Sequence, residues 1–356
     1  MTDKDVMGNT YNFWAEPDPI TGANNAHLTK TAPDGKLLWQ RDITTDRYYG
    51  INATRMKVYG ARVFICGMYG AKTEAHFGDI VLPMTPKMFQ GYFACLDTDG
   101  NWQWAVRVPA SYASSVDGFD VSNDGEIYIC GWAQGLAIPG HETPTLGNYD
   151  AYTAKYDSEK GEYIWVTRFG GRLQDTCHSV SLSGDGKLWF GGSVQVGRTV
   201  SLQFGNVKFP APTNNTGDIG RAYIGCMSCT DGNIEWVRLL YHDSSNLVHH
   251  IIADGNGGVY FGGQMVRFRL GYMTLDEIQL PFHPGSIRSA CEVYVAHIGA
   301  DKKIDWAKGI TGSGAEFLYK LELDSDILTV TGHSTAGVIC EGVTYPAGPY
   351  VIALAL

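Results

Sequence analysis

The residues of this 356-residue chain that could do chemistry are a few histidines and carboxylates at comparable places in the sequence. Where a connection enters a strand-forming segment, the chain carries Thr54, Asp117, His178, His249 with His250, and Tyr319. Imidazoles together with a carboxylate are suited to bind a metal ion. A metal site needs several ligands that converge, however, and these positions differ in residue type. We therefore interpret the histidines as solvated or hydrogen-bonded loop residues and expect no metal site.

Carboxylates could also serve in sugar chemistry, because glycoside hydrolysis uses two of them a few ångströms apart. The candidates are Asp117, Asp175, Asp243 and Glu316, but nothing in their spacing selects a pair. The sequence has no Gly-x-Ser-x-Gly elbow, no His-Glu-x-x-His zinc motif and no phosphate-binding loop. We expect a protein without catalytic residues or a cofactor, and a glycoside hydrolase or lyase is an alternative.

Two short motifs that suggest ions have simpler interpretations. Asp97-x-Asp99-Gly100-Asn101 is similar to the start of a calcium loop but lacks the distal acidic ligand, and Asp-Gly is common in hairpin turns. Cys226 and Cys229 are three residues apart in a strand-forming segment, where such residues point to opposite faces and chelate poorly. We expect the eight cysteines to be reduced, because the N-terminus has no secretion signal.

The elements that position these residues come from an internal repeat. A tryptophan follows a turn at Trp39, Trp104, Trp165, Trp236 and Trp306, at intervals of 65, 61, 71 and 70 residues. A strand-forming segment that ends in glycine recurs with nearly the same period, at Gly67, Gly131, Gly192, Gly263 and Gly332. Two independent markers with one period indicate a repeated structural unit.

Each period contains four segments with the alternation of β-strands, which we call A to D. In the second period they span about residues 116–122, 126–133, 151–157 and 162–168, with tight turns between A and B and between C and D. No segment has a convincing helical period. The pattern predicts an all-β chain that forms a single β-propeller of four-stranded antiparallel blades.

These repeats resemble the bacterial SBBP-type β-propeller repeats, in which a strand ending in glycine leads to a Phe-Gly excursion and then to a hairpin with tryptophan. Here the excursions read Phe77-Gly-Asp-Ile-Val-Leu-Pro83 and Phe204-Gly-Asn-Val-Lys-Phe-Pro210. The hairpin is also similar to the tryptophan motif of quinoprotein propellers, which place glycine four residues before tryptophan, as Gly35 and Trp39 do. The resemblance implies the fold, which hosts many unrelated functions. Quinone-dependent activity is disfavoured because the adjacent cysteine pair of many such enzymes is missing.

The two ends of the chain decide the number of blades. Complete A–D units begin near residues 54, 116, 177 and 247, the C-terminus supplies strands A to C, and the N-terminus supplies a C–D hairpin at about 26–43. Pairing of the N- and C-terminal strands in one blade would close the ring and hide its edges. We therefore predict five blades for residues 26–356, with six as the alternative, and we predict that residues 1–25 are an arm that docks on a neighbouring subunit.

The face formed by the long B–C and D–A connections is where we expect function, because long loops on one side of a scaffold are its usual working surface. Aromatic side chains there could stack on sugar rings or anchor a protein partner. The predicted binding residues are Tyr48, Tyr49, Asp117, His178, Tyr241, His249, His250 and Tyr272.

Charge and composition limit the partners. The formal net charge is −10 and 18% of the residues are charged, which argues against nucleic acid, because its binding relies on clustered lysine and arginine. Without a secretion signal or a spanning apolar segment, we expect synthesis in the cytoplasm and no membrane insertion. We expect a non-enzymatic binding or assembly protein, for instance a structural or host-recognition component of a phage virion, with other protein subunits as partners. A lectin-type, glycan-binding module is the alternative.

Overall fold

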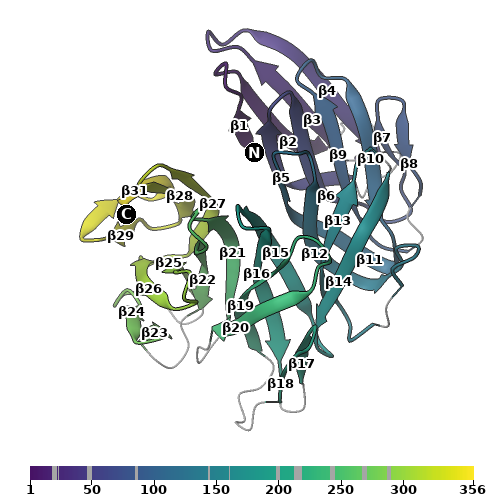
Figure 1. Ribbon diagram of the computed structural model, residues 1–356. Helices are drawn as coiled ribbons and strands as arrows, with labels where there is room; N and C mark the ends of the chain where they lie inside the picture. The colour runs from purple at the N-terminus through teal and green to yellow at the C-terminus, as the bar shows by residue number, and fades with distance from the viewer. Residues whose placement is uncertain are drawn as a thin grey trace. The chain divides into compact units, whose positions relative to one another are not determined.

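The computed structural model describes residues 1–17, 22, 24–45, 50–84, 87–142, 145–159, 161–197, 201–211, 219–240, 245–266, 271–286 and 290–356. All regular secondary structure in them is β-strand, so the all-β prediction is confirmed (Figure 1). No helix that could cross a membrane occurs in this part of the chain. The strands form two compact units, which are described separately: unit 1 is residues 1–145 with 156–163, and unit 2 is residues 146–155 with 164–356.

Unit 1 begins with sheet 1, whose strand order is β1 (Thr2–Lys4), β2 (Thr10–Pro17), β3 (Asn24–Thr31) and β4 (Leu37–Thr45). β2 pairs with β3 along its whole length, and its Tyr11 and Phe13 are buried in the core. Residues 1–17 therefore belong to sheet 1, whereas the sequence analysis predicted an arm over residues 1–25. The alternation of Tyr11 and Phe13 with polar residues gives β2 an apolar face, and sheet 1 buries that face.

Sheet 2 has the A–D order that the repeat predicts: β5 (Ile51–Tyr59), β6 (Arg62–Tyr69), β9 (Gln90–Asp97) and β10 (Trp102–Val108). The third repeat consists of β11 (Ala110–Val121), β12 (Ile127–Leu136), β13 (Asp150–Asp157) and β14 (Glu162–Gly170), close to the predicted ranges. The boundary between the two units falls within β13 and β14.

Unit 2 contains three more sheets in the same order. Sheet 4 is β15 (Asp175–Ser183), β16 (Lys187–Val196), β19 (Ile219–Ser228) and β20 (Ile234–Leu240). Sheet 5 is β21 (Asn246–Ala253), β22 (Val259–Val266), β25 (Cys291–Ile298) and β26 (Ile304–Ile310). Sheet 6 is β27 (Glu316–Asp324), β28 (Ile327–Ser334) and β31 (Gly348–Ala355), with strands A to C only.

The described residues therefore contain six repeats, which agrees with the six-blade alternative rather than with the preferred five. The predicted pairing of the N- and C-terminal strands is not formed, because β3 pairs with β2 and β4 whereas β31 pairs with β28. The physical reason lies in residues 1–17. Their strands occupy the place beside β3 that the sequence analysis had assigned to the C-terminus.

Four of the long B–C excursions form short hairpins, which the sequence analysis did not foresee (Figure 1). They are β7 (Ala75–Phe77) with β8 (Ile80–Leu82), β17 (Leu202–Phe204) with β18 (Val207–Phe209), β23 (Tyr272–Leu275) with β24 (Ile278–Pro281), and β29 (Val338–Cys340) with β30 (Val343–Tyr345). β7 pairs with β4, β17 pairs with β14, and a bridge joins Thr311 after β26 to Ile339. Phe77 and Phe204 are fully buried. These excursions thus join neighbouring repeats.

The repeated tryptophan also joins neighbouring repeats. The indole N–H of Trp39 donates to the carbonyl oxygen of Thr98 at 3.0 Å, and that of Trp165 donates to Cys229 at 3.1 Å. Each acceptor lies in the C–D turn of the following repeat. In the same turns Gly100 and Gly232 have φ values of 86° and 70° and lie against the indole rings, where a Cβ would crowd the tryptophan. The spacing of glycine and tryptophan therefore serves contact between repeats.

Candidate functional site

A β-bulge in the A strand is the feature shared by the positions that the sequence analysis singled out. In five A strands one residue has no partner on strand B, and these residues are Thr54, Asp117, His178, His249 and Tyr319. All five are exposed or half-buried, and four of them follow a buried apolar residue. A bulge takes one side chain out of the regular alternation and is common beside functional sites.

The glycine that ends each B strand makes room for the bulge. The residue before each bulge residue lies opposite this glycine: Ala53 opposite Gly67, Val116 opposite Gly131, Cys177 opposite Gly192, Val248 opposite Gly263, and Leu318 opposite Gly332. A Cβ at Gly263 would lie 1.8 Å from the carbonyl oxygen of Leu247. Only glycine lets the A strand come this close, so the glycine marker of the sequence and the bulge form one structural device.

In unit 2 a tyrosine of strand C also supports each bulge through a hydrogen bond. Its hydroxyl donates to the carbonyl oxygen two residues before the bulge residue: Tyr223 to Thr176 at 2.8 Å, Tyr294 to Leu247 at 2.9 Å, and Tyr350 to Phe317 at 3.0 Å. Each tyrosine lies opposite the glycine of strand B. In unit 1 the equivalent hydroxyl of Tyr92 is buried and makes no hydrogen bond to a described residue.

The two bulge residues of unit 1 have structural contacts as well as exposure. The Thr54 hydroxyl donates to the carbonyl oxygen of Val116 at 2.6 Å, which ties the bulge of β5 to that of β11. The Ser115 hydroxyl donates to Asp117 Oδ1 at 2.5 Å. Asp117 itself is half-buried, so its carboxylate can contact both the protein and an external group.

Of the three histidines predicted as binding residues, His178 and His249 are half-buried and His250 is buried. The rings of His178 and His249 stack with a centroid separation of 5.7 Å and an interplanar angle of 25°. The Thr176 hydroxyl lies 3.0 Å from His178 Nε2 and fixes the orientation of that ring. His250 is only 5% exposed, because the residue after the bulge returns to the buried face. The prediction that His250 contributes to the binding face is therefore not supported by its position.

The other predicted binding residues do not belong to A strands. Tyr272 is half-buried in β23, opposite Pro281 in the excursion hairpin. Tyr48, Tyr49 and Tyr241 lie outside the described residues. Tyr319, which the sequence analysis noted only as an equivalent position, is 56% exposed on β27, and Phe317 on the same strand is 38% exposed.

Two fully buried carboxyl groups stand three residues before the bulge residues of β15 and β27. Both were glycosidase candidates by sequence, and a further candidate, Asp243, lies outside the described residues. Asp175 accepts from Gly171 N at 2.6 Å and from Gln195 N at 3.1 Å. Burial, with a smaller contribution from Asp150, raises the pKa of Asp175 to about 7. Burial, with the charge of Glu292, likewise raises the pKa of Glu316 to about 7. The Asp175 carboxylate binds backbone N–H groups on either side of it, and its buried position is unsuited to contact with a polysaccharide.

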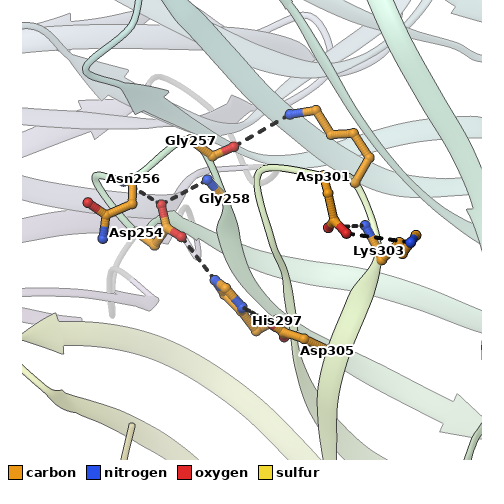
Figure 2. A network of polar contacts seen from close by, with 9 residues as sticks. Asp254, Asn256, Gly257, Gly258, His297, Asp301, Lys303 and Asp305 are labelled. Carbon is orange, nitrogen blue, oxygen red and sulfur yellow. Dashed lines mark hydrogen bonds and ion pairs between the residues drawn. The ribbon is translucent and has the colours of Figure 1, made fainter.

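A histidine between two carboxylates lies at the tight-turn end of sheet 5, where no sequence motif indicated a site (Figure 2). His297 Nε2 is 3.0 Å from Asp254 Oδ2, and Nδ1 is 2.8 Å from Asp305 Oδ2. Burial opposes ionisation of Asp254, but hydrogen bonds from Asn256 N, His297 and Gly258 N outweigh it and lower the pKa of that carboxyl. With carboxylates at both nitrogens, this ring has no lone pair directed at a substrate and cannot serve as a general base.

Cys226 and Cys229 have structural contacts. In the described part of the chain, no group of three or more histidine, cysteine or acidic side chains is placed to hold a metal ion. Cys226 is buried in the core of unit 2, and burial raises the pKa of its thiol. Cys229 accepts a hydrogen bond from Trp165 through its backbone. The CxxC motif is thus divided between a core position and a turn.

Comparison with known proteins gives a likeness of fold only. No protein-family model and no curated protein matches the sequence. Hydrazine synthase of Kuenenia stuttgartiensis has a TM-score of 0.48 and 12% identity, over 86% of this chain and 70% of that one. The β-propeller domain of the Trilobed protease from Pyrococcus furiosus has a TM-score of 0.37 and 11% identity, and the match covers 97% of this chain and 92% of that domain. Quinohemoprotein alcohol dehydrogenase from Comamonas testosteroni has a TM-score of 0.44 and 10% identity, and the match covers 97% of this chain and 65% of that one. The activities of these proteins are not carried over to this chain.

Proposed function

We propose that the protein is a non-enzymatic binding and assembly protein whose A-strand bulges present the binding residues. The observation that carries this proposal is a contrast within the repeat. The bulge recurs in five A strands, and the glycine that makes room for it is the same each time, but the side chain at the bulge changes. A constant scaffold with a variable exposed residue is typical of repeat proteins that bind a partner over successive repeats.

The chemistry of the described side chains supports binding over catalysis. The bulge residues offer a hydroxyl, a carboxylate, two imidazoles and a phenol, all of which form hydrogen bonds without needing activation. The carboxyl groups with a pKa near 7 are fully buried at the first residues of β15 and β27, and His297 is engaged on both ring nitrogens. As the partner we propose another protein subunit of a larger particle, such as a phage virion assembled from cytoplasmic proteins.

Photo-cross-linking in cells that produce the protein tests the proposal, with a photo-activatable amino acid introduced at position 249 or at position 178. We expect cross-links to one defined partner from position 249 and from position 178. Glu235 provides the control, because it is also a bulge residue and is exposed, but it lies on the D strand of sheet 4. Equal cross-linking from positions 249 and 235, or none from either histidine position, would overturn the proposal.

Glycan binding is a second candidate, and the aromatic pair on β27 favours it. Phe317 and Tyr319 are both exposed on one strand, and exposed aromatic rings can stack on sugars. A glycan array with the wild type and the Tyr319→Ala variant separates this candidate from protein binding. Signals that disappear in Tyr319→Ala would support a lectin-type function, and silence of the wild type at high protein concentration would exclude it.

A further inference from the structure

The hairpin between β1 and β2 displays two apolar side chains at its tip. Val6 is 101% exposed and Met7 is 76% exposed, more than any other large hydrophobic residue described. Leu37 and Leu38, which are 54% and 46% exposed, begin β4 at the same end of sheet 1. The pairing places them there, because Lys4 lies opposite Thr10, Thr10 opposite Thr31, and Thr31 opposite Leu37. We call Val6, Met7, Leu37 and Leu38 the apolar tip.

The turn that carries Val6 and Met7 is fixed from within by Asp5. Its Oδ1 accepts from Met7 N at 3.0 Å and from Asn9 N at 2.9 Å, and its Oδ2 accepts from Asn9 Nδ2 at 2.9 Å and from the Tyr11 hydroxyl at 3.1 Å. Lys30 Nζ lies 3.6 Å from the same carboxylate. Val6 and Met7 are thus held in fixed positions by contacts that do not use their own side chains.

A second turn in unit 1 shows that this conformation does not require apolar residues. Asp97 Oδ1 accepts from Asp99 N at 3.0 Å and from Asn101 N at 2.8 Å, and Oδ2 accepts from Asn101 Nδ2 at 2.9 Å. The two turns therefore share the same hydrogen bonds. Thr98 and Asp99 stand where the first turn has Val6 and Met7. Rigidly displayed apolar side chains without a structural role mark an interaction surface.

We propose that the apolar tip is a contact between two copies of this chain. Its rim carries both signs of charge, because Lys4, Asp34 and Lys36 are all exposed beside the apolar residues. Such a rim is complementary to itself across a two-fold axis, whereas a uniformly charged partner would favour a rim of one sign.

The strength of this contact follows from its small size. Four side chains cover much less than the roughly 800 Å² per partner of a stable dimer. The contact is therefore weak between two free copies and gains strength where many copies are held together. The inference rests on the proposed assembly function and specifies a second copy as one of the partners.

Sedimentation equilibrium of the full chain over a range of concentrations tests the contact. We expect the weight-average mass of the wild type to rise with concentration. The double variant Val6→Thr/Met7→Asp reproduces the Thr98–Asp99 turn and should weaken self-association by about tenfold or more. Val81→Thr, which changes an exposed valine of β8, is the control and should associate like the wild type. A monomeric wild type, or equal association of the double variant, would overturn the proposal.

Cysteine cross-linking provides an independent readout, because Met7 and Asp99 occupy equivalent turn positions. In oxidising buffer Met7→Cys should form a disulfide-linked dimer much faster than Asp99→Cys, and equal rates would contradict the contact. Phosphatidylcholine vesicles are the other probe. Vesicle binding that depends on Val6 and Met7, without self-association, would show that lipid is the occupant and overturn the proposal. If self-association fails while position 249 still cross-links to a partner, the proposed function stands without this contact.

Discussion

The Tyr223 hydroxyl donates a 2.8 Å hydrogen bond to the carbonyl oxygen of Thr176 across Gly192, whose strand β16 lies between theirs. This bond holds the backbone of β15 in place two residues before the bulge residue His178. It explains why the repeat combines a glycine on strand B with a tyrosine on strand C. Neither residue is exposed, so both serve the geometry of the bulge rather than contact with a partner.

Removal of this hydroxyl should destabilise unit 2. In Tyr223→Phe the carbonyl of the half-buried Thr176 loses this donor, and we expect a loss of about 1 to 3 kcal/mol in the free energy of unfolding. Tyr92→Phe is the matched control, because the Tyr92 hydroxyl is buried without a hydrogen bond to a described residue. That variant should be neutral or slightly stabilised. Urea unfolding of both variants measures the difference, and equal losses would contradict the role given to the Tyr223 bond.

A side chain at the glycine of strand B should be costlier still. A Cβ at Gly192 would lie 2.0 Å from the carbonyl oxygen of Thr176, so Gly192→Ala must displace the A strand. We expect a loss of about 2 to 4 kcal/mol by urea unfolding. Gly184→Ala should change stability by less than about 0.5 kcal/mol, since no atom lies within 4 Å of a Cβ at that position. A mild effect at Gly192 would show that the bulge tolerates a wider spacing.

The repeat made the strands predictable from the sequence, because periodic glycine and tryptophan reflect contacts that recur in every repeat. The predicted A strand at 116–122 became β11 (Ala110–Val121), and the equivalent positions Thr54, Asp117, His178, His249 and Tyr319 became bulge residues. Residues 1–17 were misassigned because they contain neither marker. Their two strands form through Tyr11 and Phe13, whose alternation is too short to stand out.

The polar groups of the interior were less predictable, because each depends on residues far apart in the sequence. His297 meets Asp254 at a separation of 43 residues, and no motif links the two. His250 was grouped with His249 as its neighbour in sequence, but the bulge at His249 places the two residues in different environments. The positions of these side chains follow from the pairing of the strands, which the residue types alone do not indicate.

The two carboxylates of the His297 network should differ in their contribution to stability. Asp254 is 10% exposed and also accepts from Asn256 N and Gly258 N, whereas Asp305 is 53% exposed and contacts the ring alone. Asp254→Asn should therefore cost about 1 to 3 kcal/mol, and Asp305→Asn less than about 1 kcal/mol. Urea unfolding at one pH compares them. A larger loss for Asp305→Asn would mean that the turn does not depend on Asp254.

Glu316 should make the stability of unit 2 fall as the pH rises. Its pKa is about 7 in the folded chain, against the ordinary glutamate value of 4.5, which applies to the unfolded chain. Between these values the folded state binds more protons than the unfolded state, so the free energy of unfolding decreases from about pH 4.5 to about pH 7 and stays low above it. Asp175, with a folded pKa also near 7, acts in the same direction.

The variant Glu316→Gln isolates this effect, because its amide cannot ionise. Relative to the wild type, we expect it to be more stable by about 1 to 3 kcal/mol at pH 8 and to lose this advantage at pH 5. Glu322→Gln, at an exposed position of the same strand where the carboxylate pairs with Lys320, is the control and should follow the wild-type curve. Urea midpoints between pH 5 and pH 8 provide the measurement. Curves of wild type and Glu316→Gln that run parallel over this range would show that the buried carboxyl does not titrate there.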